Sequence, residues 1–164
     1  MNAAANHIVI LCSYLNVPGG YEKAVITIAN LFVRKGHRVT LVILDNTAEL
    51  FYPADPAVRI IQQPLTFGVT TKGNVITRKL NFLSDIRKLK KIFRETAPDF
   101  IIASDYVFAA AAVLSGIGKK AKLVLWEHHH FGTLKKNSFW NYLSARTFKK
   151  LDAIVCLNED ERKH

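Results

Sequence analysis

Cysteine is scarce in this sequence, and long apolar runs are missing. The chain has 164 residues and two cysteines, Cys12 and Cys156, each inside a short apolar run. We interpret both as small buried thiols, which indicates a reducing compartment. The first residues, MNAAANHIVILCSY, lack the charged n-region and long h-region of a signal peptide. The longest nearly apolar run, VFAAAAVLSGIG, is shorter than the about 18 residues that indicate a membrane span. These absences predict a soluble, cytosolic protein.

Several ligand-binding motifs are also missing. The sequence contains no GxGxxG and no GK[ST], which argues against a nicotinamide-type fingerprint and a P-loop. Cys12-Ser13-Tyr14 stands where a receiver domain would have paired acidic residues. The three consecutive histidines 128–130 lack the i, i+4 spacing of a helical metal pair, and no cysteine cluster supports zinc. We therefore expect no metal site.

Charge of one sign is in excess and unevenly placed. The chain carries a formal net charge of +10. Residues 78–150 hold 15 basic and 5 acidic side chains, an excess equal to that of the whole chain. A localised basic surface indicates an anionic partner, such as nucleic acid, an anionic membrane or a phosphorylated ligand.

What the sequence does contain is an alternation of strand and helix patterns. The strand patterns are continuous apolar runs, typical of strands buried on both faces, and one helix pattern places Ala24, Ile28, Leu31 and Phe32 on one face. This alternation predicts an α/β fold with an open, mostly parallel sheet and helices on both faces. We predict strands over 7–13, 38–45, 58–63, 99–105, 122–129 and 153–158, and helices over 21–35, up to about 96, over 107–118 and over 138–150.

A pair of glycines follows the first predicted strand. Gly19 and Gly20 stand immediately before the first predicted helix. Ligands of open α/β sheets bind beyond the carboxyl ends of the strands, and helix N-termini offer free N–H groups to anions. A backbone without side chains would let a phosphate approach. The alternative is a simple turn, which Pro-Gly-Gly forms well.

The stretch PGGYEKAVITIANLFVRKGHRVTLV resembles the opening of glycosyltransferase family 4, which consists of retaining enzymes with the two-domain GT-B architecture. Further on, APDFIIASD, KLVLWEHHHF and LDAIVCLNEDERKH resemble the family's later strands in the same order. The resemblance covers nearly the whole chain. The matching residues of the opening are Gly19, Gly20, Glu22, Gly36, His37 and Val39.

The resemblance implies that residues 1–164 form one Rossmann-like N-terminal domain. In this family that domain holds the acceptor, and a C-terminal domain, expected to be absent here, holds the nucleotide-sugar. It implies an enzyme that transfers a sugar from a nucleotide-sugar to a saccharide or lipid-linked acceptor, with no cofactor in this part. The piece alone would be inactive.

Residue roles follow from the resemblance. Gly19 and Gly20 would bring N–H groups toward donor phosphates or the acceptor. His128 matches the strand-end histidine, which would contact a sugar hydroxyl or position the acceptor, and His129 is the competitor one residue on. A loop histidine bonded to backbone is the plainer alternative. Asp105 ends a strand at the same edge and either binds acceptor hydroxyls or caps the next helix, with the cap slightly favoured.

Basic residues beside aromatics predict a membrane contact. Arg87, Lys91 and Arg94 stand at i, i+4 and i+7 on the helix that ends near 96. That face lies away from the helix's apolar stripe, which consists of Phe82, Ile86, Leu89 and Phe93. Such basic residues suit an anionic lipid surface, and family members that build envelope polysaccharides work at the inner leaflet. The expected location is therefore cytoplasmic, peripheral to the inner face of the membrane. A second basic and aromatic group comprises Lys135, Lys136 and Trp140.

Two other classes remain open. The net charge would suit a basic nucleic-acid-binding α/β module, although no RNP-like aromatic pair, zinc pattern or helix-turn-helix signature is present, so no nucleic-acid partner is expected. A stand-alone nucleotide-binding protein of Rossmann-like type is the other alternative. A solvated basic face with buried aromatics would also explain the charge without any membrane.

Overall fold

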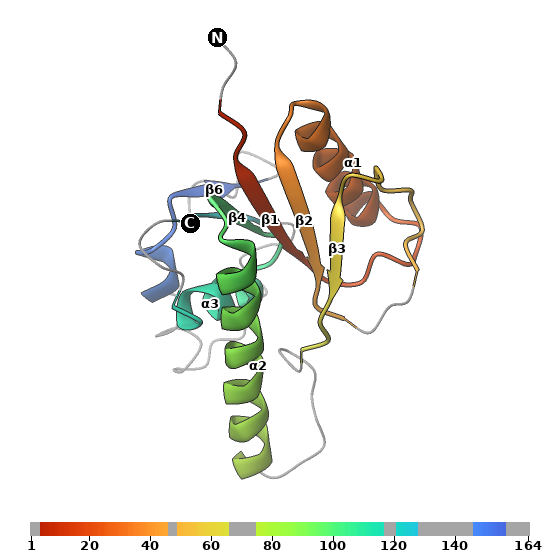
Figure 1. Ribbon diagram of the computed structural model, residues 1–164. Helices are drawn as coiled ribbons and strands as arrows, with labels where there is room; N and C mark the ends of the chain where they lie inside the picture. Colours follow the sequence, from red (N-terminus) through yellow and green to blue (C-terminus); the bar gives the residue numbers. More distant parts are fainter. Residues whose placement is uncertain (1–3, 46–48, 66–74, 117–120, 128–145, 157–164) are drawn as a thin grey trace.

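The computed structural model describes residues 4–45, 49–65, 75–116, 121–127 and 146–156. The chain forms one six-stranded sheet in which every neighbouring pair of strands is parallel (Figure 1). The strand order is β3-β2-β1-β4-β5-β6. The strands are β1 (His7–Cys12), β2 (Arg38–Ile43), β3 (Arg59–Gln62), β4 (Phe100–Ala103), β5 (Lys122–Trp126) and β6 (Ala153–Val155).

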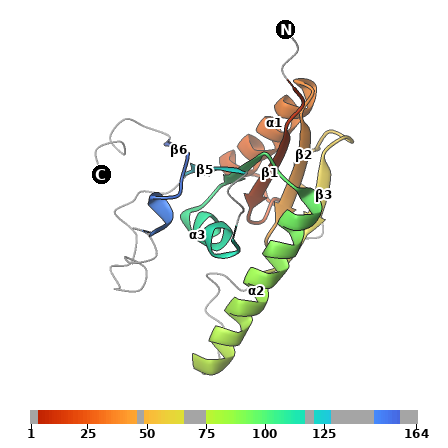
Figure 2. The same ribbon diagram turned by 60° about the vertical axis from the view of Figure 1, so that its left-hand side comes forward.

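Three helices are described beside the sheet: α1 (Gly20–Arg34), α2 (Val75–Thr96) and α3 (Tyr106–Leu114). In Figure 2, α1 lies on one side of the sheet, and α2 and α3 lie on the other. This arrangement follows from right-handed crossovers, because the chain steps one way from β1 to β2 and the opposite way from β3 to β4 and β5. The predicted α/β fold with helices on both faces is confirmed.

Strand β1 shows why an apolar run becomes a central strand. All six of its residues are buried. Alternate side chains point to opposite faces, so Ile8 and Ile10 join the α1-side core while Val9 and Leu11 join the α2- and α3-side core. Both faces of β1 are therefore covered, as its uninterrupted apolar run predicts.

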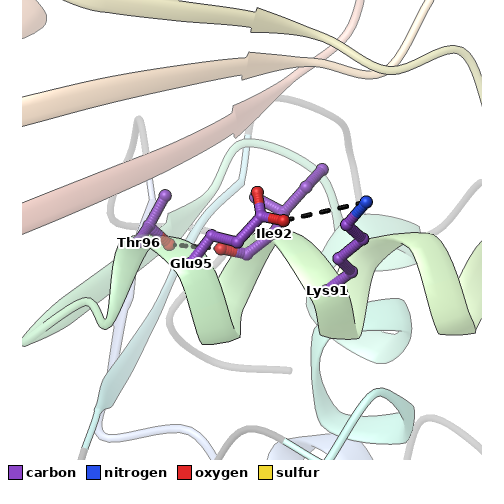
Figure 3. A network of polar contacts seen from close by, with 4 residues as sticks. All are labelled: Lys91, Ile92, Glu95 and Thr96. Carbon is purple, nitrogen blue, oxygen red and sulfur yellow. Dashed lines mark hydrogen bonds and ion pairs between the residues drawn. The ribbon is translucent and has the colours of Figure 1, made fainter.

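The ends of the helices follow local signals. Gly36 ends α1 with φ at +85°, a left-handed conformation that glycine adopts without steric cost. The helix predicted over 21–35 is confirmed, but its predicted apolar face is wrong: Leu31 is 40% exposed, and the buried apolar residues are Val25, Ile26 and Ala29. Helix α2 ends at Thr96, two residues before Pro98, and the hydroxyl of Thr96 donates to the carbonyl oxygen of Ile92 at 2.7 Å (Figure 3).

A buried histidine joins the end of α2 to the amino edge of the sheet. His7 is 3% exposed. Its Nδ1 lies 2.5 Å from the carbonyl oxygen of Thr96, and its Nε2 lies 2.9 Å from Oγ1 of Thr40. Because a carbonyl oxygen only accepts, Nδ1 carries the proton in the neutral ring and Nε2 accepts from Thr40. Burial lowers the pKa of His7 from its ordinary value, with the nearby Arg38 contributing in the same direction and the bond to Thr96 opposing it.

Some sequence predictions need correction. Among the described residues, β5 ends at Trp126 and β6 ends at Val155, whereas the sequence predicted strands over 122–129 and 153–158. Residues 128–129 and 157–158 lie outside the described residues. Strand β3 is mostly exposed and β6 wholly so, because they lie at the two edges of the described sheet. Cys156 is half-buried, whereas Cys12 is fully buried as predicted. The helix predicted over 138–150 lies largely outside the described residues.

Candidate functional site

The candidate site lies at the carboxyl edge of the sheet, between β1 and β4. Strands β2 and β3 are added on one side of β1, and strands β4, β5 and β6 are added on its other side. The direction in which the chain adds strands therefore reverses between β1 and β4. Ligands of open α/β sheets bind at such a reversal, beyond the carboxyl ends of the strands. The described segments that border it follow β1 at Ser13, β4 at Ser104 and β5 at Glu127.

The two glycines before α1 differ in their surroundings. Gly19 is the N-cap residue of α1, with φ −157° and ψ 163°, an extended backbone that any residue adopts. A methyl group at Gly19 would lie 2.0 Å from Oε2 of Glu22, whereas a methyl group at Gly20 would meet nothing within 4 Å. A side chain at Gly19 would therefore displace the carboxylate of Glu22. Gly20 is exposed at the helix start, which leaves its backbone open to a ligand.

The side chain of Glu22 packs against the glycine turn. It lies in the first turn of α1 and is 5% exposed. A carboxylate at this position complements the positive end of the helix dipole. Its packing against Gly19 supports a structural role for Glu22.

A group of hydroxyls joins the first turn of α1 to both strands of the reversal. The hydroxyl of Tyr21 lies 2.6 Å from Oγ of Ser104, and the backbone N–H of Ser13 donates to it at 3.1 Å. Burial raises the pKa of Tyr21 to about 12, so the hydroxyl is neutral at physiological pH. The tyrosine thus ties the glycine turn to the ends of β1 and β4.

Sequence reasoning did not predict this hydrogen-bonded set of Ser13, Tyr21 and Ser104. The available signals were a tyrosine next to the glycine pair and one serine near the end of each of two predicted strands. It also missed Glu127, which follows β5, is 4% exposed and has a backbone N–H that donates to the carbonyl oxygen of Val155 at 2.9 Å.

Asp105 acts as a helix cap. Its Oδ1 accepts a hydrogen bond from the backbone N–H of Val107 at 2.6 Å, at the N-terminus of α3. The capping role that the sequence slightly favoured is confirmed. A carboxylate has further acceptor positions, so contact with an acceptor sugar stays a prediction.

The histidines of the predicted site are not described. His128 and His129 lie outside the described residues, which end in this region at Glu127. Their predicted roles therefore stay predictions. Within the described part of the chain, no group of three or more His, Cys, Asp or Glu side chains is placed to hold a metal ion.

The basic face of α2 is separated from its apolar stripe. Arg87, Lys91 and Arg94 are exposed, and Lys91 forms an ion pair of 3.8 Å with Glu95 (Figure 3). Both partners are half or more exposed, so this pair contributes little to stability. On the opposite side, the predicted stripe of Phe82, Ile86, Leu89 and Phe93 is half-buried to fully buried.

The separation of charged and apolar faces on α2 is thus as predicted. The other basic and aromatic residues of that prediction, Lys135, Lys136 and Trp140, lie outside the described residues.

Comparison with known proteins finds glycosyltransferases that are similar in sequence to this chain. The chain is 25% identical over 148 residues to an uncharacterized glycosyltransferase of Haemophilus influenzae, covering 88% of this chain and 38% of that protein. It is also 25% identical over 144 residues to a Campylobacter jejuni protein, again covering 88% of this chain and 38% of the relative. That protein is named the GalNAc-α-(1→4)-GalNAc-α-(1→3)-diNAcBac-PP-undecaprenol α-1,4-N-acetyl-D-galactosaminyltransferase.

Solved structures show the same fold. A lipopolysaccharide outer core galactosyltransferase in its apo form matches with a TM-score of 0.67 at 15% identity, over 96% of this chain and 41% of that one. A sucrose-phosphate synthase of Thermosynechococcus elongatus matches with a TM-score of 0.66 at 11% identity, over 96% of this chain and 44% of that one. The chain spans about two fifths of the length of these proteins.

The sequence profile of Glycosyltransferase Family 4 matches residues 18–164. The match begins just before the glycine turn and includes β2 and β4, the two strands that pair with β1. The chain belongs to glycosyltransferase family 4.

Proposed function

We propose that the chain is the acceptor-binding half of a retaining glycosyltransferase. The enzyme would transfer a sugar from a nucleotide-sugar to a membrane-linked saccharide or lipid acceptor in polysaccharide biosynthesis. One observation carries the proposal most strongly: Gly20 has open space beside it at the start of a 15-residue helix, on the rim where the sheet order reverses. Free N–H groups at such a helix start bind phosphates and other oxygen ligands.

The proposed site is shared with a second domain. The relatives are more than twice as long as the part that this chain matches, which leaves room for a domain that binds the nucleotide-sugar. Gly19 and Gly20 would face it across a cleft. His128 would contact the acceptor or the transferred sugar, with His129 as the alternative, and Asp105 would accept hydrogen bonds from acceptor hydroxyls while it caps α3.

The basic face of α2 would hold the domain against an anionic membrane at the inner, cytoplasmic face. The undecaprenol in the name of the Campylobacter relative supports a lipid-linked acceptor, and the exposure of Arg87, Lys91 and Arg94 supports a lipid contact. In the described ranges, no helix is long and apolar enough to span a membrane. The proposed attachment through this face is peripheral.

Sugar transfer is the direct test of the site. The longer protein, incubated with nucleotide-sugars and undecaprenyl-diphosphate-linked saccharides, should form a glycosylated product. Gly20→Val should lower the rate at least tenfold, because branched carbons would fill the open space at the helix start. Leu31→Gln, on the outer surface of α1 where the side chain is 40% exposed, should leave it unchanged. Full activity of Gly20→Val would contradict the proposed site.

Vesicle binding tests the membrane part separately. The change is Arg87, Lys91 and Arg94 to Gln together. Each basic residue contributes about 1 kcal/mol at an anionic surface, and Glu95 partly offsets Lys91, so affinity for phosphatidylglycerol vesicles should fall roughly 30- to 150-fold. Phosphatidylcholine vesicles should not distinguish the variant from the original protein.

A matched control removes the same charge elsewhere. Lys23, Arg34 and Lys35 are exposed cations on and next to α1, and their joint change to Gln should weaken vesicle binding far less. Equal losses from both triple variants would show that only net charge matters. Tighter binding to random oligonucleotides than to anionic vesicles at the same salt concentration would favour the nucleic-acid alternative.

A further inference from the structure

Two exposed aromatic side chains stand on neighbouring segments at the carboxyl edge of the sheet. Of the described tyrosine, phenylalanine and tryptophan residues, only Tyr14 and Phe51 are exposed, at 45% and 52%. They belong to the segments that follow β1 and β2, and the backbone N–H of Phe51 donates to the carbonyl oxygen of Leu15 at 2.8 Å. Val17, on the first of these segments, is 40% exposed. We call Tyr14, Val17 and Phe51 the edge patch.

Packing fixes the exposed position of Phe51. Burial alternates along residues 50–54, and Leu50, Tyr52 and Ala54 pack against the α1-side core. Phe51 stands between two of these residues and is exposed. Its ring contacts that of Tyr52, with the ring centroids 5.0 Å apart and an angle of 76° between the planes. The contact braces the Phe51 ring while half of its surface stays open.

Hydrogen bonds hold the same segment against α1. The Oδ1 of Asn30 accepts from the backbone N–H of Asp55 at 2.8 Å, and its Nδ2 donates to the carbonyl oxygen of Pro53 at 3.3 Å. The segment after β1 is anchored by Leu15, which is 0% exposed. Rings that are already held in place lose little conformational entropy when a ligand stacks on them. The edge patch is therefore preorganised for contact.

The polar groups beside the patch favour a neutral ligand that has both apolar and polar parts. Asn16 is exposed between Tyr14 and Val17 in the sequence, and the exposed Glu49 stands two residues before Phe51. A pyranose ring presents C–H groups on its faces and hydroxyl groups around it. The negative face of an aromatic ring attracts such C–H groups, and an amide and a carboxylate bind hydroxyls. The carboxylate of Glu49 would repel a phosphate or an anionic lipid.

We propose that the edge patch is a stacking subsite for a neutral pyranose ring of the acceptor saccharide. The patch and the glycine turn share one connection, because Tyr14 and Val17 lie in the segment that runs from β1 to Gly19. A sugar stacked on the patch therefore extends the site that begins at the open backbone of Gly20. The inference rests on the proposed function, since it assigns a substrate class to part of that site. Tyr14 and Phe51 then determine affinity for the acceptor and not the rate of the chemical step.

Saturation-transfer NMR on the longer protein tests the sugar contact without sugar transfer. The probes are the methyl α-pyranosides of glucose, galactose, mannose and N-acetylglucosamine. When the aromatic protons of the protein are saturated, at least one probe should receive magnetisation mainly at the C–H groups of one ring face. Tyr14→Ala and Phe51→Ala should each lower that signal at least threefold. Leu114→Ala, which removes a side chain 38% exposed at the end of α3, should not lower it. Equal signals in all variants, or no signal from any probe, would overturn the subsite.

Acceptor kinetics separate this inference from the proposed function. In the transfer assay with the lipid-linked saccharide, Tyr14→Ala and Phe51→Ala should each raise the acceptor KM about fivefold, which corresponds to about 1 kcal/mol. The kcat and the KM of the nucleotide-sugar should stay unchanged. Tyr14→Phe and Phe51→Tyr keep an aromatic ring and should recover most of the lost affinity.

An unchanged acceptor KM in a protein that forms product would overturn the subsite and leave the proposed function standing. Absence of product from the original protein would contradict the proposed function, and the NMR signals would still decide the subsite. If Phe51→Ala weakened binding to phosphatidylcholine vesicles while the acceptor KM stayed unchanged, the patch would be a lipid contact and the subsite would be wrong.

Discussion

Replacing Gly19 and Gly20 by alanine, one at a time, tests their different roles with the same chemical change. In Gly19→Ala the new methyl group would lie 2.0 Å from Oε2 of Glu22, so the carboxylate must leave a site where the residue is 5% exposed. In Gly20→Ala the methyl group meets nothing within 4 Å. The structure therefore predicts opposite signs for the two changes in the free energy of unfolding.

The magnitudes follow from the surroundings. Overpacking costs about 1–3 kcal/mol, and the flexible end of Glu22 places Gly19→Ala near the lower limit. Alanine is a poorer N-cap than glycine by some tenths of a kcal/mol, and the lower entropy of the unfolded chain returns about 0.4–1 kcal/mol. We expect Gly19→Ala to cost about 1 kcal/mol. Gly20→Ala, at the first helical residue, should stabilise by up to about 0.5 kcal/mol, because alanine has the higher helix propensity.

Urea unfolding followed by circular dichroism measures both changes, and a double-mutant cycle identifies the cause. Adding Glu22→Ala to Gly19→Ala removes the clashing carboxylate, so the pair should show a favourable coupling of about 1 kcal/mol. Adding Glu22→Ala to Gly20→Ala should show none. If Gly19→Ala were as stable as Gly20→Ala, or if the coupling were absent, the contact between Glu22 and Gly19 would not be what requires glycine at this position.

Three further predictions concern stability. Because burial lowers the pKa of His7 in the folded state, the stability it confers is complete above about pH 6.5 and declines as the pH falls below that value; urea titrations from pH 8 to 5 should show a decline that His7→Gln reduces. Tyr21→Phe removes the partner of the buried Ser104 hydroxyl and of the part-buried backbone N–H of Ser13, and it should cost about 1–2 kcal/mol. Tyr14→Phe, at a side chain 45% exposed, should leave the urea midpoint unchanged, and equal effects would refute the role of the Tyr21 hydroxyl. Leu89 and Leu83 of α2 are 0% and 50% exposed. Leu89→Ala should therefore lower the free energy of unfolding by about 2–5 kcal/mol, and Leu83→Ala by less than about 0.5 kcal/mol. Similar losses of stability in thermal unfolding would contradict the orientation of the helix.

Much of the fold follows from local patterns. The apolar run of β1 predicted a strand covered on both faces, and the structure buries every residue of it. The apolar spacing of α1 predicted a helix over 21–35, and α1 ends within one residue of that prediction. The same spacing predicted the wrong core face, because α1 buries Val25, Ile26 and Ala29 and leaves Leu31 40% exposed. Such features need only neighbours in sequence, because helix and strand periods decide which side chains share a face.

Contacts between residues far apart in the sequence could not be predicted from local patterns. The sequence treated Gly19 and Gly20 as equivalent, and the structure separates them through the position of one carboxylate. It offered no reason to pair Tyr21 with Ser104, 83 residues away. Which strands become edges likewise depends on the order of the whole sheet, so the exposure of β6 was not predicted.

The sequence by itself determined the alternation of elements, the apolar stripe of α2, the family and the place of the glycine turn. Only the tertiary structure decided which glycine is open, what the hydroxyl of Tyr21 joins, and which strands lie at the edges of the described sheet. The physical reason is that periodicity records which side chains of one segment lie together, whereas the hand and direction of the crossovers decide what lies opposite them.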